Sequence, residues 1–186
     1  MKALRKALEG TQGTEVRNDM GTTWLKEIPK KVNIFVWRAK LRRLPTRVVL
    51  DEIGVDLDSS LCPRCGTEVE SVEHALITCG KVRKIWHLVG RRWRVDLGSK
   101  ITINEIEEAG FDRRSNGKGS RLWTATIWSF LYFIWSNRNK CVFEKASTEI
   151  ASLFLEFQLK SFDWVSRRDK NSKIDLSNWL ANPSGS

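Results

Sequence analysis

The segment "SLCPRCGTEVESVEHALITCG", residues 60–80, constrains the fold of this chain more than any other stretch. It holds three of the four cysteines and one of the two histidines, spaced as Cys-x2-Cys-x8-His-x4-Cys: Cys62, Cys65, His74 and Cys79. Zinc prefers four thiolate and imidazole ligands in a tetrahedron, and a Cys-x2-Cys turn presents two sulfurs to one ion. We therefore predict one structural Zn²⁺ on these four residues. The set is closed, with no open coordination position for catalysis.

The local sequence predicts how the two halves of this site are shaped. Gly66 follows the second cysteine, where the chain must reverse and a positive φ is useful. Ser71 is placed to cap a short helix that carries His74. On a continuous α-helix five residues turn by about 500°, so His74 and Cys79 would point about 140° apart. We expect the helix to loosen before Cys79 and to stop at Gly80.

The start of the chain, "MKALRKALEGTQGTE", lacks the apolar core of a secretory signal. The longest apolar stretch, residues 127–135, is far shorter than the ~20 residues that span a bilayer. We expect a nuclear or cytoplasmic protein that is not secreted and has no membrane partner. Thiols stay reduced in those compartments, which favours metal binding over a disulfide or four unrelated buried cysteines.

The remaining pattern predicts helices and no strands. Residues 27–46 read as a helix with Pro29 in its first turn and Pro45 at its end. Four apolar residues recur at helical spacing, namely Val32, Phe35, Val36 and Ala39. Three more widen the apolar surface and predict burial on more than one side, namely Ile34, Trp37 and Leu41.

Further helices follow along the chain. Thr46 is placed to cap a short helix that Gly54 closes, and residues 81–89 put Val82, Ile85, Trp86 and Val89 on one face. Residues 102–110 form a candidate short helix, and residues 121–143 read as a long buried helix with Trp128 and Trp135 on one side. Thr148 is placed to cap the last helix, whose apolar stripe is Ile150, Leu153, Phe154, Phe157, Trp164 and Val165.

The predicted fold class is therefore all-α: a small helical domain clipped by one Cys3His zinc site and followed by Trp-rich C-terminal helices. The predicted parts are an N-terminal tail or short helix (1–21), the zinc-binding domain (22–95), a linker with a possible short helix (96–120), a C-terminal helical region (121–180) and a tail (181–186). Cys141 and His87 remain outside the ligand set. Neither has an obvious catalytic partner, so Cys141 is interpreted as a small buried apolar residue and His87 as a surface or half-buried one.

Charge is unevenly distributed along a chain whose net charge is +10 and whose isoelectric point is about 9.7. Residues 30–47 hold seven basic and no acidic residues, and residues 80–94 hold six basic and no acidic residues. The segment between them, 48–79, holds seven acidic residues and one arginine. Nucleic-acid affinity depends largely on Lys and Arg displacing counterions. We therefore expect any phosphate contacts on the basic flanks, with the zinc fixing the angle between them.

The candidate contacts are the basic residues of both flanks with one tryptophan: Arg38, Lys40, Arg42, Arg43, Arg47, Lys81, Arg83, Lys84, Arg91, Arg92, Trp93 and Arg94. In "GRRWRV" three arginines surround Trp93, which is a candidate base-stacking plane. The alternative is that Trp93 packs into the core, which we favour, and that the basic residues are a solvated helix face.

Several motifs in order resemble one known family. They are "WLKEIPKKVNIFVWRAKLRRLPTR", "SLCPRCGTEVESVEHALITCGKVRKIW", "WSNRNKCVF" and "WVSRRDK" with "WLANP". Over about residues 22–183 they resemble the zinc-binding region at the C-terminal end of plant non-LTR (LINE-type) retrotransposon reverse transcriptases. The resemblance implies Cys62, Cys65, His74 and Cys79 as zinc ligands, and a role in holding template RNA or target DNA.

The chain departs from a whole polyprotein of that kind. It starts at Met1 just before the zinc region and contains no Asp-Asp polymerase motif. We expect a retrotransposon fragment or a domesticated gene that is not an enzyme and takes no small-molecule substrate. The predicted function is nucleic-acid binding, with RNA slightly preferred over DNA because of the resemblance. The alternative is a protein-interaction module, whose partner could be a reverse transcriptase supplied in trans.

Overall fold

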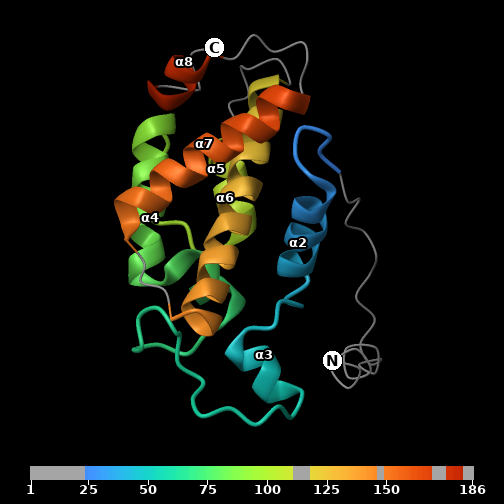
Figure 1. Ribbon diagram of the computed structural model, residues 1–186, viewed down its shortest axis with the longest axis vertical. Coiled ribbons are helices and arrows are strands. Elements are labelled where there is room, and N and C mark those ends of the chain that lie inside the picture. Colours follow the sequence, from blue (N-terminus) through green and yellow to red (C-terminus); the bar gives the residue numbers. More distant parts are fainter. Residues whose placement is uncertain (1–23, 111–117, 146–148, 169–174, 182–186) are drawn as a thin grey trace.

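The computed structural model describes residues 24–110, 118–145, 149–168 and 175–181, and its fold is all-α as predicted (Figure 1). The elements in chain order are α2 (Lys30–Lys40), α3 (Arg47–Glu52), the π-helical turn η1 (His74–Thr78), α4 (Gly80–Trp93), α5 (Ile103–Ala109), α6 (Lys118–Phe143), α7 (Ile150–Arg168) and α8 (Leu176–Ala181). The described residues form no β-strand. Their isolated antiparallel bridge joins Leu61 to Val69.

Helix α6 lies at the centre of the fold. Helix α2 lies along one side of it and α4 along the other, while α7 crosses both α6 and α4 (Figure 1). Trp123, Trp128 and Trp135 of α6 are all buried, which confirms the prediction of a long buried helix. Because each buried aromatic side chain removes a large apolar area from water, this helix organises the core.

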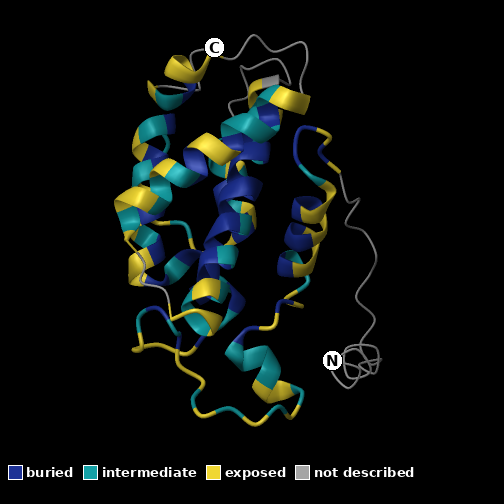
Figure 2. Ribbon diagram, viewed as in Figure 1, coloured by how far each residue is buried: buried dark blue, intermediate teal, exposed yellow. Residues whose placement is uncertain are grey.

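Helix α2 differs from its prediction at both ends and on one face. Pro29 occupies the N-cap position and not the first turn. The helix ends at Lys40, well before Pro45, and Arg42 in the turn that follows adopts a left-handed φ of 53°. The four residues predicted at core spacing are all buried, namely Val32, Phe35, Val36 and Ala39. The prediction of burial on a second side is wrong: Ile34 and Trp37 are exposed, because α6 covers only one side of this helix (Figure 2).

Helix α3 begins at its predicted cap. The Thr46 hydroxyl accepts a hydrogen bond from the Val49 amide, and Gly54 closes the turn after α3 with a φ of 77°. Helix α5 confirms the short helix expected near residues 102–110. Thr102 and Glu105 form a reciprocal capping box at its start, which satisfies two amides that would otherwise lack partners.

The C-terminal helices close one end of the core. In α7, Phe157 and Val165 are buried, and the other residues of the predicted stripe are half-buried. Thr148 lies outside the described residues, and the Glu149 carboxylate accepts hydrogen bonds from amides of the first turn. Helix α8 was not predicted as a separate element, and it delivers a fully buried Trp179 to the core.

One hydrophobic cluster joins both halves of the chain. It includes Val36 of α2, Trp86 of α4, Phe130 of α6 and Trp179 of α8. The boundaries proposed within residues 22–180 stay predictions, and the tails 1–21 and 182–186 lie outside the described residues. Within the described ranges, no helix combines the length and apolarity needed to cross a bilayer.

Candidate metal centre

The first half of the centre is a tight reversal of the chain at the two leading cysteines. The Gly66 amide donates to the Cys62 carbonyl (2.8 Å), and the Cys62 amide donates to the Glu68 carbonyl (2.7 Å). Gly66 adopts the expected positive φ, 69°. A side chain at that φ would be strained, so glycine lets the loop fold back and place both sulfurs on one side.

The second half is the π-helical turn η1, and it explains how His74 and Cys79 meet. The Ser71 hydroxyl accepts a hydrogen bond from the His74 amide (3.0 Å), as predicted for a cap. The Cys79 amide then donates to the His74 carbonyl (3.0 Å), a bond between residues five apart. This wider turn supplies the expected loosening and brings the two side chains to the same side. The predicted stop at Gly80 is wrong, because Gly80 is the first residue of α4.

The two halves bring all four predicted ligands together. The donor atoms of Cys62, Cys65, His74 and Cys79 lie within 4.8 Å of one another, and none of the cysteines forms a disulfide. Ligand atoms of a tetrahedral zinc–thiolate site lie about 3.7 Å apart, so small movements would close the four donors on one ion. Three thiols and one imidazole are a zinc donor set. The centre fits one structural Zn²⁺ that the protein encloses.

Both ring nitrogens of His74 make contacts that orient the ring for metal binding. Its Nε2 atom lies 3.4 Å from the Cys65 sulfur, and its Nδ1 atom lies 3.3 Å from a Glu68 carboxylate oxygen. The Nδ1 contact is within ion-pair distance but falls short of a hydrogen bond. A carboxylate behind a histidine ligand fixes the ring and strengthens it as a donor, so Glu68 is placed to support His74.

Proximity perturbs the protonation of all four donors. The hydrogen bond between Cys62 and Cys79 raises the pKa of Cys62 to about 12 and lowers the pKa of Cys79 to about 7. Burial opposes ionisation of Cys65, but hydrogen bonds with Thr67, Glu68 and His74 lower its pKa. Burial likewise opposes charging of His74, but its contact with Cys65 raises its pKa. A divalent cation bound by these donors would displace their protons.

Residues 3–86 match a family model described as zinc-binding in reverse transcriptase. Over this segment, which is less than half of the chain, the protein is similar to the zinc-binding domain of reverse transcriptases. The match contains all four ligands and ends within α4. No curated protein and no solved structure matches the chain.

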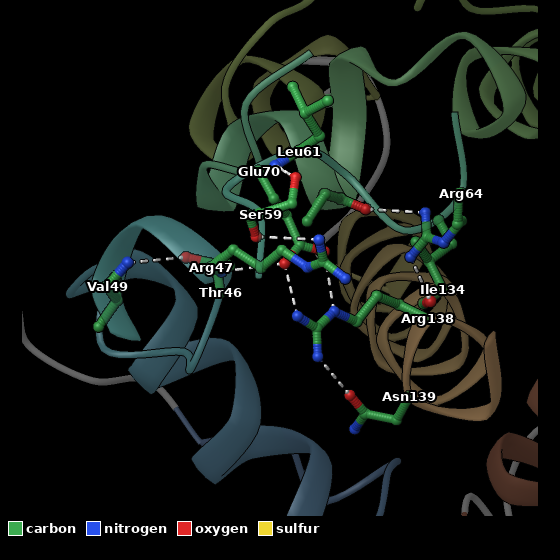
Figure 3. Close-up of polar contacts among 11 residues, drawn as sticks. Thr46, Arg47, Val49, Ser59, Leu61, Arg64, Glu70, Ile134, Arg138 and Asn139 are labelled. Carbon is green, nitrogen blue, oxygen red and sulfur yellow. Dashed lines mark hydrogen bonds and ion pairs between the residues drawn. The ribbon is translucent and has the colours of Figure 1, made fainter. Parts of the chain in front are cut away.

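Arg64 anchors the loop before η1, residues 60–73, which we call the metal loop, to α6, and no local sequence pattern identifies it. Its guanidinium is buried and donates hydrogen bonds to the Ala75 carbonyl (2.9 Å) and the Ile134 carbonyl (2.8 Å) (Figure 3). Burial lowers the pKa of Arg64, and the sulfurs of Cys79 and Cys62 oppose that shift. A Zn²⁺ with three thiolates and a histidine carries one net negative charge, which this buried cation faces.

A buried ion pair makes a second anchor. Arg138 of α6 donates from two nitrogens to the two carboxylate oxygens of Glu70, and both side chains are buried (Figure 3). The Arg47 amide, at the start of α3, also donates to Glu70 (3.0 Å). Glu70 thus joins the metal loop, α3 and α6. In the sequence, Glu70 stands out only as part of the acidic segment 48–79, because its partner lies 68 residues away.

Four of the predicted nucleic-acid contacts are engaged within the protein. Lys40 pairs with Glu107 (2.7 Å), and Arg42 pairs with Glu73 (2.9 Å). Arg83 donates to the carbonyls of Gly98 and Lys100, and Arg47 donates to the Ser59 carbonyl (2.9 Å). These residues would have to give up such contacts before binding phosphate.

Two predicted contacts from "GRRWRV" lie inside the protein. Trp93 is buried, and its ring packs edge-on against the rings of Trp123 and Trp179, with centroid separations of 5.1 Å and 6.4 Å. This packing agrees with the alternative that Trp93 belongs to the core, so its buried ring is not available to stack on a base. Arg92 lies over the Trp179 ring at 5.6 Å, its guanidinium nitrogens are shielded from water, and burial lowers its pKa to about 10. Its predicted contact with a phosphate would require the surrounding helices to open.

The other six candidate nucleic-acid contacts are exposed, namely Arg38, Arg43, Lys81, Lys84, Arg91 and Arg94. Among the described residues none of them forms an ion pair. The α2 and α4 groups lie on opposite sides of α6, so they form two separate surfaces (Figure 1). Elsewhere, Cys141 is half-buried with its sulfur 3.9 Å from the Asn137 side-chain oxygen, and His87 is exposed.

Proposed function

We propose that this chain is a zinc-stabilised nucleic-acid-binding module derived from a LINE-type retrotransposon reverse transcriptase, and that it has neither polymerase nor endonuclease activity. The zinc-binding domain match supports the origin from a reverse transcriptase. The plant LINE origin and the preference for RNA over DNA rest on the motif resemblance alone. Such a module would act in the nucleus or the cytoplasm.

The observation that carries this proposal is a set of six exposed cations without a counter-charge. Of the seven acidic residues in 48–79, three have partners: Glu70 pairs with Arg138, Glu73 with Arg42, and Glu68 lies beside the His74 ring. The six exposed cations of α2, α4 and the turns that follow these helices have no such counter-charge in the described residues. Cations left free of carboxylates are available to displace counterions from phosphates.

In this proposal the metal is structural. It joins the metal loop to η1, and Arg64 and Glu70 join that loop to α6. Removing the ion would therefore destabilise the packing of the metal loop and η1 against the helices, and it would not itself remove a phosphate contact.

The test is fluorescence anisotropy of the zinc-loaded protein with labelled single-stranded RNA, single-stranded DNA and duplex DNA. Two charge-neutralised variants are compared, Arg38→Gln with Arg43→Gln and Arg91→Gln with Arg94→Gln. The matched control is Arg167→Gln with Arg168→Gln, which removes the same charge from the end of α7. At least one test pair should weaken binding and reduce its salt dependence by about one unit of slope for each phosphate that the variant can no longer bind. Unchanged affinity in both pairs would refute phosphate binding by these surfaces.

The alternative function is protein–protein interaction, and the exposed Trp24 and Trp37 favour it. Tryptophan is enriched among the residues that dominate protein interfaces. Binding to a protein through such residues would depend weakly on salt, whereas phosphate binding weakens steeply. A folded, zinc-loaded sample that binds no nucleic acid at low salt would therefore support the alternative.

A further inference from the structure

The outward face of α2 carries an unusual combination of side chains. Lys30, Ile34, Trp37, Arg38 and Leu41 fall within an arc of about 100° around the helix axis. Ile34 is 44% exposed and Trp37 is 39% exposed, so part of the apolar surface of this arc faces solvent. We call these five residues the α2 outer face. It is turned away from the buried side that packs on α6 (Figure 2).

This face is positively charged along its length. Lys30 and Arg38 are exposed on it, and Lys31 borders it, held over the rings of Tyr132 (5.3 Å) and Trp164 (5.6 Å). Helix α2 itself contains no acidic residue. The nearest carboxylate in sequence, Glu27, is buried. Glu107 and Glu73 approach α2 and the turn after it, but they are paired with Lys40 and Arg42. An apolar stripe bordered by exposed cations is complementary to an anionic partner that also presents flat apolar rings.

A second exposed aromatic ring is held near the same helix. The Asn33 side chain accepts a hydrogen bond from the Leu25 amide (2.8 Å) and donates one to the Leu25 carbonyl (3.0 Å). These two bonds fix the segment before α2 against its first turns. Trp24, the neighbour of Leu25, is 53% exposed. The segment therefore holds Trp24 near the first turns of α2, while Trp37 lies further along the same helix.

We propose that the α2 outer face binds single-stranded nucleic acid, with Trp37 stacking on an unpaired base and Arg38 and Lys30 contacting the adjacent phosphates. This proposal rests on the nucleic-acid-binding function proposed above. A single strand is favoured over a duplex because only unpaired bases expose the flat faces on which an aromatic ring stacks. It is favoured over a protein because the charged side chains exposed on this face, Lys30 and Arg38, are both cations. Trp37 takes the role that the sequence analysis considered for Trp93, whose ring is buried.

The proposal is tested with Trp37→Ala, Trp37→Phe and a matched aromatic control, Phe143→Ala, at an exposed residue on the last turn of α6. Affinity for labelled single-stranded RNA, single-stranded DNA and duplex DNA is measured by anisotropy, with circular dichroism and zinc content confirming that each variant is folded. Base stacking on one aromatic ring predicts that affinity for single strands falls roughly 5- to 100-fold with Trp37→Ala. Trp37→Phe should retain much of the affinity, and Phe143→Ala should match wild type.

Charge is tested separately. Arg38→Gln should weaken binding and reduce the salt slope by about one, whereas Arg38→Lys should keep the slope. Trp37→Ala should leave the slope unchanged, because stacking releases no counterions.

Three results would overturn the proposal, and they differ in whether the proposed nucleic-acid-binding function would still stand. Wild-type affinity in folded Trp37→Ala would exclude this face and leave the nucleic-acid function to other surfaces. Equally weakened binding of duplex and single strands would exclude stacking on unpaired bases. No binding of the wild-type protein to any nucleic acid at low salt would refute the proposed function as well, and would leave the face to a protein partner.

Discussion

The buried pair between Glu70 and Arg138 allows a quantitative test of how the metal loop is held. In Glu70→Gln the side chain keeps its size but loses its charge, and Arg138 stays buried without a counter-ion. Breaking a buried ion pair on one side typically costs about 3–5 kcal/mol, because the remaining charge is desolvated and unpaired. For a chain of this length that corresponds to a fall in Tm on the order of 10 °C. The hydrogen bond from the Arg47 amide is weakened too, which adds to the destabilisation.

The assay is urea unfolding of zinc-loaded protein, followed by far-ultraviolet circular dichroism. The matched control is Glu156→Gln, which breaks the exposed pair with Lys160 and should cost about 1 kcal/mol or less. The double variant Glu70→Gln with Arg138→Met removes both charges. It should be more stable than the sum of the two single effects predicts, by about 1–3 kcal/mol. If Glu70→Gln lost no more stability than Glu156→Gln, the assignment of Glu70 as a buried anchor would be wrong.

Three further predictions concern the metal and the core. Co²⁺ should bind metal-free protein with the visible spectrum of a tetrahedral thiolate site, and Cys65→Ala should weaken that spectrum; an octahedral spectrum would contradict the Cys3His assignment. Zinc affinity, measured by competition with a chelator, should fall as the pH is lowered from 8 to 6, because protons compete with the metal for the thiolates and for His74. Since the pKa of His74 is raised, the loss of zinc affinity should begin at a higher pH than it would for an ordinary histidine ligand. A constant affinity over that range would contradict this. Trp93→Ala should cost about 3–5 kcal/mol of unfolding free energy and leave nucleic-acid affinity of the folded protein unchanged, whereas a stable variant with reduced affinity would show that Trp93 contacts nucleic acid after all.

Local patterns in the chain were sufficient for the ligand set and most helices. The spacing of Cys62, Cys65, His74 and Cys79 is a property of a short segment, so the ligand set could be recognised without knowing which distant residues pack against it. The need to relax the helix between His74 and Cys79 followed from helical geometry alone. The form of that relaxation, a π-turn leading directly into α4, depended on how η1 and α4 pack against each other, and the prediction of a stop at Gly80 failed there.

Sequence patterns did not show which side chains are exposed. The apolar spacing of Ile34 and Trp37 resembled that of buried residues, yet α6 covers only the other side of α2. Trp93, between exposed arginines in sequence, faces the core because α6 and α8 supply Trp123 and Trp179 to enclose it.

The metal, its four ligands, the helical class and the uneven distribution of charge could all be predicted from the amino-acid sequence, because each depends on spacing or composition within a short stretch. The packing of the helices was needed to show that Glu70 pairs with Arg138, that Arg64 bonds to α6, and that Arg38 forms no ion pair with a described residue. The physical reason is that a charged group buried far from its partner in sequence leaves no local signal. Its burial and its pairing are set by the elements that pack over it.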